Sequence, residues 1–136
     1  MLNVICFTSG GTIDSAASVQ ELSASLFEFQ KSGYLCDTVI VADDGQVKAH
    51  SVVLAAASPV FKRALQSRNH PVEHTVVLPG MQRAALGIII EFVYTGRITV
   101  AKDSMKIMDA IEDLGIKLHI SRYLFHITAV LMSLLG

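Results

Sequence analysis

Apolar positions along this chain repeat with a helical period in some stretches and with a strand period in others. The first helical stretch starts at Ser18, which with Glu21 has the spacing of a capping box, and Gly33 offers a left-handed end. Its apolar stripe consists of Val19, Leu22, Leu26 and Phe29. The pattern therefore predicts a helix that begins at Ser18 and carries one apolar face.

The next stretch predicts a hairpin followed by two short helices. "DTVIVA" is rich in β-branched residues and predicts a strand, "DDG" predicts a turn, and "QVKAH" the returning strand. "SVVLAAA" is too rich in alanine for a strand and predicts a buried helix. Ser58 has the chemistry of a helix cap and Pro59 suits a first helical position, so "PVFKRAL" is predicted to be a second helix at an angle to the first.

The remaining segments predict three more strands and three more helices. "TVVLPG" and "RITV" are predicted strands, a helix ends at Gly96, and Asp103 caps another that ends at Gly115. The inward residues are expected to be Leu86, Ile89, Ile90 and Val93 in the first helix and Ile107, Met108, Ile111 and Leu114 in the second. "NVICF" predicts a strand near the start, and the segment from Lys117 a helix that is apolar nearly all round. The expected fold class is α+β, with two helical hairpins beside a small mixed β-sheet.

The length of the chain is that of a single domain. Its composition indicates more apolar surface than a soluble monomer usually carries. The chain has 136 residues, of which 51% are hydrophobic and 17% charged, and its mean hydropathy is +0.49. The net charge of -1 does not indicate the basic surface that direct nucleic-acid binding requires. Cys6 and Cys36 cannot form a disulfide framework, so we expect reduced thiols and a cytoplasmic or nuclear protein.

Two segments resemble targeting signals without fitting them. The first residues lack the basic region of a signal peptide. The last apolar segment has the length of a short span, but His119, Arg122 and His126 lie in its first half, and a charged residue there costs about 2.5–3.5 kcal/mol. We therefore expect no membrane association and interpret the segment as a buried or partner-facing helix.

The strongest enzymatic signal is "TSGGTIDS", which resembles the N-terminal signature of L-asparaginase-type amidohydrolases. That resemblance makes Thr12 a remote candidate nucleophile, with glycine backbone N–H groups near a substrate oxyanion. Nothing downstream supplies the second threonine, lysine and aspartate that such a site needs. The favoured interpretation is a flexible loop before a helix, and the protein is expected not to be an enzyme.

The histidines and two further polar residues have structural explanations. His70 and His74 are separated by Pro71 in a loop, so they form no helical ligand pair, and no metal or other cofactor is expected. Asp37 begins an apolar strand and is expected to pair with a backbone N–H. His50 is expected to be a core histidine that holds the strand-to-helix turn by hydrogen bonds.

Taken together, "LCDTVIV", "GQVKAHSVVLAAASPVFK", "VVLPG" and "IIIEFVYTGRI" resemble the BTB/POZ domain of the kelch-type or zinc-finger-type branch. The resemblance runs from about Ser18 to Ile116. It implies three segments: an N-terminal strand and loop at 1–17, the BTB/POZ domain at 18–116, and an apolar C-terminal helix at 117–136. It also implies a non-enzymatic protein-interaction domain, an adaptor for a cullin-RING ubiquitin ligase or, alternatively, a transcription-factor domain that recruits co-repressors.

The resemblance further implies a homodimer built on the first helix, with "NVICF" as a strand exchanged between subunits. Phe27 lies off the apolar stripe and needs its own cover, which also favours a dimer. The expected dimer-interface residues are Val4, Leu22, Leu26, Phe27, Phe29, Asp37 and Ser51. Ser51 departs from the family, which usually has Arg or Lys there, so a charged dimer pocket with Asp37 is not expected.

For a cullin or other partner, the resemblance points to the short helix after Pro59. Phe61, Leu65 and Glu73 are the expected partner contacts, while His50, Ser58 and Pro59 are expected to be structural. Cullin-binding members usually carry a hydrophobic-x-Glu motif after this helix. Here Glu73 lies late in the loop, behind Pro71, so we expect weak or absent cullin binding by the isolated chain without a following domain.

Overall fold

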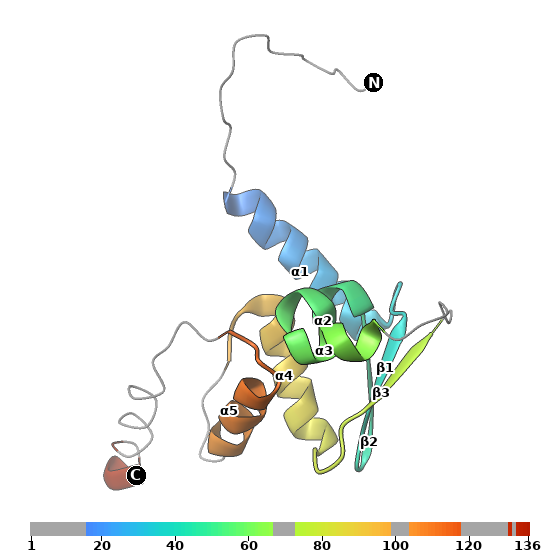
Figure 1. Ribbon diagram of the computed structural model, residues 1–136. Coiled ribbons are helices and arrows are strands. Elements are labelled where there is room, and N and C mark those ends of the chain that lie inside the picture. The colour runs from blue at the N-terminus through green and yellow to red at the C-terminus, as the bar shows by residue number, and fades with distance from the viewer. Residues whose placement is uncertain (1–15, 67–72, 99–103, 118–130, 132) are drawn as a thin grey trace, which may run out of the picture.

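A computed structural model describes residues 16–66, 73–98, 104–117, 131 and 133–136 (Figure 1). The predicted "NVICF" strand with Val4 and Cys6, the loop with Thr12, and most of the closing apolar segment lie outside these residues. So does Asp103, the predicted cap.

The described sheet has three strands in the order β2-β1-β3. The strands are β1 (Thr38–Ala42), β2 (Gly45–Ala49) and β3 (His74–Val77). Strand β1 pairs antiparallel with β2, with Ile40 opposite Val47, and parallel with β3, with Ile40 opposite Val76. The sheet is therefore mixed, as predicted, and β2 is one of its edges.

Helices cover this sheet and form most of the domain. They are α1 (Ala16–Ser32), α2 (Ser51–Ala57), α3 (Pro59–Leu65), α4 (Arg83–Thr95) and α5 (Ser104–Asp113). Helices α2 and α3 form a hairpin in front of α1 and α4, and the beginning of α1 extends away from the rest of the domain (Figure 1). Ser23 of α1 donates a hydrogen bond to the carbonyl of Tyr94, which ties α1 to α4.

Ser58 joins the α2–α3 hairpin to the end of α5. Its side chain accepts from the backbone N–H of Phe61 at 3.1 Å, which confirms the predicted cap, and donates to the carbonyl of Leu114 at 2.5 Å. Pro59 is the first residue of α3, as predicted. Gly115 ends α5 with φ +67°, and a Cβ there would lie 2.8 Å from the Pro59 ring. A larger residue at 115 would push these two elements apart.

The core is formed by the sheet and the helices α2, α3, α4 and α5. Its buried hydrophobic residues are Ile40, Ala42, Ala49, Leu54, Phe61, Leu86, Ile89, Ile90, Tyr94, Met108, Ile111, Leu114 and Ile116. Most of the inward residues predicted for α4 and α5 are therefore buried, whereas Val93 and Ile107 are half-buried at the margin of the core. Gly96 ends α4 in the left-handed region, as predicted.

Three local predictions need correction. Ser18 lies inside α1, since the helix already includes Ala16, so Ser18 is not its cap. Helix α2 buries Leu54 but leaves Val52 73% exposed, so it is a surface helix rather than a buried one. Arg97 and Ile98 belong to no strand, and the rest of "RITV" lies outside the described residues.

Candidate functional site

The described residues carry surface hollows and two hydrogen-bond networks. Among them, no group of three or more His, Cys, Asp and Glu is placed to hold a metal ion. His74 lies half-buried at the start of β3, and the other candidate metal ligands His70, His119 and His126 fall outside the described residues. No helix within the described ranges is long and apolar enough to cross a membrane.

His50 is buried where β2 turns into α2, and its polar groups are all paired. The hydroxyl of Tyr94 accepts from the His50 backbone N–H at 2.9 Å and lies 2.6 Å from Nδ1. Nε2 lies 2.9 Å from the carbonyl of Tyr34, which can only accept, so Nε2 carries a hydrogen. Tyr94 then donates to Nδ1. His50 therefore links the strand-to-helix turn to Tyr94 and Tyr34 by hydrogen bonds.

Tyr94 is the centre of this network, and it was missed in the sequence. Burial raises the pKa of Tyr94 to about 12 against a smaller opposing effect of the His50 N–H, so its hydroxyl stays protonated and able to donate. The available signal was a tyrosine among the buried positions of "FVYTG", since a buried hydroxyl requires a partner. Burial also raises the pKa of the Cys36 thiol, with a further contribution from Asp37, so the thiol stays protonated.

Asp37 forms the second network, at the N-terminus of α2. One carboxylate oxygen accepts from the Ser51 backbone N–H at 2.7 Å, and the other accepts from the Ser51 hydroxyl at 2.5 Å. The predicted pairing of Asp37 with a backbone N–H is confirmed. Burial alone would raise the pKa of Asp37, but the bonds from Ser51, its own backbone and Thr38 together lower it. Ser51 thus supplies Asp37 with two neutral hydrogen-bond donors.

This lowered pKa predicts an acid-sensitive contribution to stability. The contribution is complete above the unfolded-state pKa of about 4 and is lost as the pH falls through the lower folded-state pKa. We expect Asp37→Asn to flatten the fall in unfolding free energy as the pH is lowered from about 5, measured by urea denaturation. The control is Asp113→Asn, at the exposed end of α5. Equal slopes for the wild type and Asp37→Asn would contradict the prediction.

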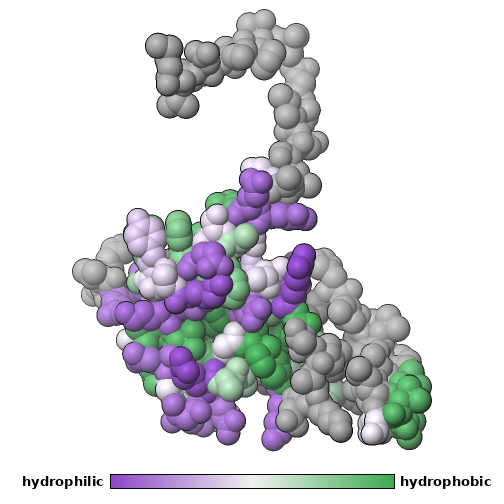
Figure 2. Space-filling view, turned by 180° about the vertical axis from the view of Figure 1, so that it is seen from behind, coloured by the Kyte–Doolittle hydropathy of each residue, from purple (hydrophilic) through white to green (hydrophobic). Residues whose placement is uncertain are grey.

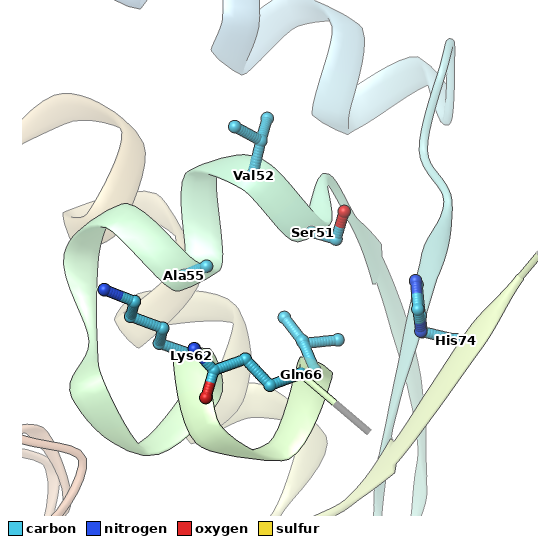
Figure 3. Close-up of a pocket in the computed structure, with 7 residues that line it drawn as sticks. Ser51, Val52, Ala55, Lys62, Gln66 and His74 are labelled. Atoms are coloured by element: carbon cyan, nitrogen blue, oxygen red, sulfur yellow. The ribbon is translucent and has the colours of Figure 1, made fainter. Parts of the chain in front are cut away.

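A hollow of about 310 Å³ opens between α2, α3 and the start of β3 (Figure 3). It is lined by Ser51, Val52, Ala55, Lys62, Leu65, Gln66 and His74. Val52 points away from Lys62 and Gln66, toward the side where α1 passes (Figure 3). Leu65 is half-buried where it lines this hollow.

Phe61 does not line the hollow between α2 and α3. Its side chain is 0% exposed, because α3 turns it into the core, so the expected direct contact with a partner is corrected to a structural role. Glu73 is exposed just before β3 and is not among the residues that line the hollow. Of the three predicted partner contacts, the structure places only Leu65 in the hollow.

Helix α1 presents its apolar stripe largely to solvent. Val19 is 69% exposed and Leu22 61%, whereas Leu26 and Phe27 pack against the core. The Phe27 ring lies 6.2 Å from that of Tyr94. The expectation that Phe27 would need cover from a second subunit is therefore corrected, because its own chain supplies much of that cover.

Comparison with known proteins gives one consistent result. The profile described as the BTB/POZ domain matches residues 26–129. The chain is 32% identical over 103 residues to human zinc finger and BTB domain-containing protein 3, and 35% identical over 86 residues to mouse Kelch-like protein 28. These matches cover 72% and 62% of the chain.

A solved structure, the BTB domain of zebrafish PATZ1, has a TM-score of 0.69 and 21% identity. The match covers 91% of this chain and 98% of that one, which establishes the fold. Zinc finger and BTB domain-containing protein 3 and Kelch-like protein 28 are much longer proteins, since the chain spans 17% and 15% of their lengths.

Proposed function

Because the chain belongs to the BTB/POZ family, a family of protein-interaction domains, we propose that it is a homodimeric adaptor that presents the α2–α3 hollow to a cullin-RING ubiquitin ligase. The compartment we propose is the cytoplasm or nucleus. We further propose the interaction domain at 18–116, with an N-terminal strand and loop before it and an apolar helix after it.

The homodimer is supported by apolar side chains that the chain itself leaves uncovered. Val19 and Leu22 lie one helical turn apart on α1, and Val52 of α2 is also largely exposed. Full burial of a large apolar side chain contributes about 1.5–3 kcal/mol. In a two-fold dimer each contact is made twice, so these residues can offset an association cost of about 4–15 kcal/mol.

One observation carries the cullin proposal: α3 buries Phe61 and thereby turns Leu65 into the hollow beside α2. An apolar side chain with neighbouring polar groups from Lys62, Gln66 and His74 forms the kind of small pocket that anchors one partner side chain. Because the hydrophobic-x-Glu motif is missing, this pocket must provide most of the affinity.

The test is titration of the full chain with the cullin N-terminal domain by calorimetry. We expect a dissociation constant weaker than about 1 µM, and a further loss of about 10-fold or more for Leu65→Asp. Ala64→Asp is the matched control, since Ala64 is exposed on the same helix and does not line the hollow. No binding at about 100 µM, or equal affinity of Leu65→Asp and the wild type, would contradict the proposal.

The alternative is a transcription-factor domain that recruits co-repressors. It is favoured by the similarity to zinc finger and BTB domain-containing protein 3 and to the BTB domain of PATZ1. Binding of a co-repressor fragment that survives Leu65→Asp, together with failure to bind the cullin domain, would select this alternative.

A further inference from the structure

The side of the domain opposite the α2–α3 hairpin carries a groove that the proposed functions do not use. Two adjoining hollows of about 320 and 410 Å³ meet there and share Gln30, Lys31, Val47 and Arg83. We call them together the β2 groove, because α1, β2 and α4 form its walls. In the view from behind, hydrophilic side chains cover much of the sheet side, with hydrophobic ones visible between them (Figure 2).

The two ends of the β2 groove differ in chemistry. One end is lined by the cations Lys31, Lys48 and Arg83, and no residue that lines this end carries a carboxylate. The other end shares Lys31 and Arg83 but lacks Lys48, and it adds the apolar groups of Phe27, Ala84, Gly87 and Ile90 and the carboxylate of Glu91. The cationic end is thus a local feature in a chain whose net charge is -1.

Packing restricts where the cationic side chains can go. Arg83 lies across Gly45, where a Cβ would be 2.5 Å from the Arg83 Cδ, and its Nε donates to the Gln46 carbonyl at 3.2 Å. Lys48 passes beside Gly33, where a Cβ would lie 3.7 Å from the Lys48 Cδ, and its side chain stays exposed. Holding Arg83 in advance reduces the entropy that it loses when it binds an anion.

Lys31 is held in a different way, by an ion pair and by an aromatic ring. Its Nζ lies 2.6 Å from a carboxylate oxygen of Glu28 and 4.9 Å from the Phe27 ring centroid. Because Glu28 already balances this charge, Lys48 and Arg83 carry most of the attraction for an anionic ligand.

The β2 edge itself is not the binding element. Its carbonyls at Gln46 and Lys48 accept side-chain hydrogen bonds from Arg83 and Gln30, the latter at 2.9 Å. A ligand that added a strand would have to break both bonds. Recognition in the β2 groove therefore has to use side chains of the ligand rather than its backbone.

We propose that the β2 groove binds a short peptide segment of a partner protein in which acidic side chains are followed by an apolar side chain. The carboxylates contact Lys48 and Arg83, and the apolar side chain packs on Phe27, Val47 and Ile90. Glu91 repels carboxylates from the apolar end and so fixes the direction of the peptide. This site is independent of the dimer and of the α2–α3 hollow.

The test follows backbone amide shifts of the full, nitrogen-15-labelled chain by NMR. The probe is a pool of ten-residue peptides with two adjacent glutamates followed by leucine or phenylalanine, compared with the same pool with lysines in place of the glutamates. We expect the acidic pool to shift the amides of Lys31, Gln46, Lys48 and Arg83, and to bind about 10-fold more weakly at 0.3 M than at 0.05 M salt because exposed charges are screened.

Charge reversal separates recognition from folding. The variant Lys48→Glu, Arg83→Glu is expected to lose the response to the acidic pool and to gain one to the lysine pool, while Arg63→Glu on α3 keeps the wild-type preference. Equal shifts with both pools, no shift at about 1 mM peptide, or the same shifts with inorganic phosphate alone would overturn the proposal.

Discussion

Replacing Phe61 with alanine is expected to lower the free energy of unfolding by about 3–5 kcal/mol. Phe61 is fully buried in the core, and its backbone N–H is held by the Ser58 cap, so α3 cannot easily shift to fill the space left by the ring. Domains of this size are stable by only about 5–15 kcal/mol, so a large part of the total is lost.

Urea denaturation followed by circular dichroism measures this loss. The matched control is Val77→Ala on β3, which removes apolar atoms that are already 63% exposed and should change the unfolding free energy by no more than about 0.5 kcal/mol. Similar values for the two variants would show that α3 does not pack as described, and would reopen Phe61 as a partner contact.

The double variant Val19→Asp, Leu22→Asp is expected to convert the proposed homodimer into a folded monomer. Two apolar side chains per subunit are removed from the proposed interface, at about 1.5–3 kcal/mol each, and the four new carboxylates of a dimer repel one another. We expect the dimer dissociation constant to rise by at least about 1000-fold. Neither side chain belongs to the core, so the fold should persist.

Sedimentation velocity at about 10 µM protein distinguishes the two states. The control, Gln20→Asp with Ala24→Asp, adds the same charge at exposed positions of the same helix outside the apolar stripe. A wild type that sediments as a monomer, with an unchanged circular dichroism spectrum, would contradict the homodimer. The apolar surface of α1 would then have to serve a different partner.

Local signals predicted the α2–α3 hairpin and the helix ends. Ser58 and Pro59 define the start of α3 by chemistry that acts within four residues, and Gly96 and Gly115 end helices by a backbone conformation that other residues rarely adopt. These features depend little on the rest of the fold. For that reason a single sequence was sufficient to predict them.

Long-range packing explains what was not predicted. Both Phe27 and the stripe of α1 are apolar, and periodicity alone cannot tell which of them faces the core of the same chain. The structure assigns Phe27 to the core because Tyr94, 67 positions away in α4, lies beside it. The pairing of Tyr94 with His50 and the burial of Phe61 also depend on residues far apart in the sequence. For this reason neither was predicted.

The hydrogen bonds from Gln30 and Arg83 to β2 also bear on how copies of this chain behave when crowded. An uncovered edge strand is a template on which another chain can add its own strand, and this leads to aggregation. Gln30 and Arg83 occupy the Lys48 and Gln46 carbonyls, and Lys48 adds a charge that stacked strands would have to bring together. In a chain with mean hydropathy of +0.49, these side chains direct self-association away from the sheet edge and toward helices, where contacts end with a closed assembly instead of a fibre.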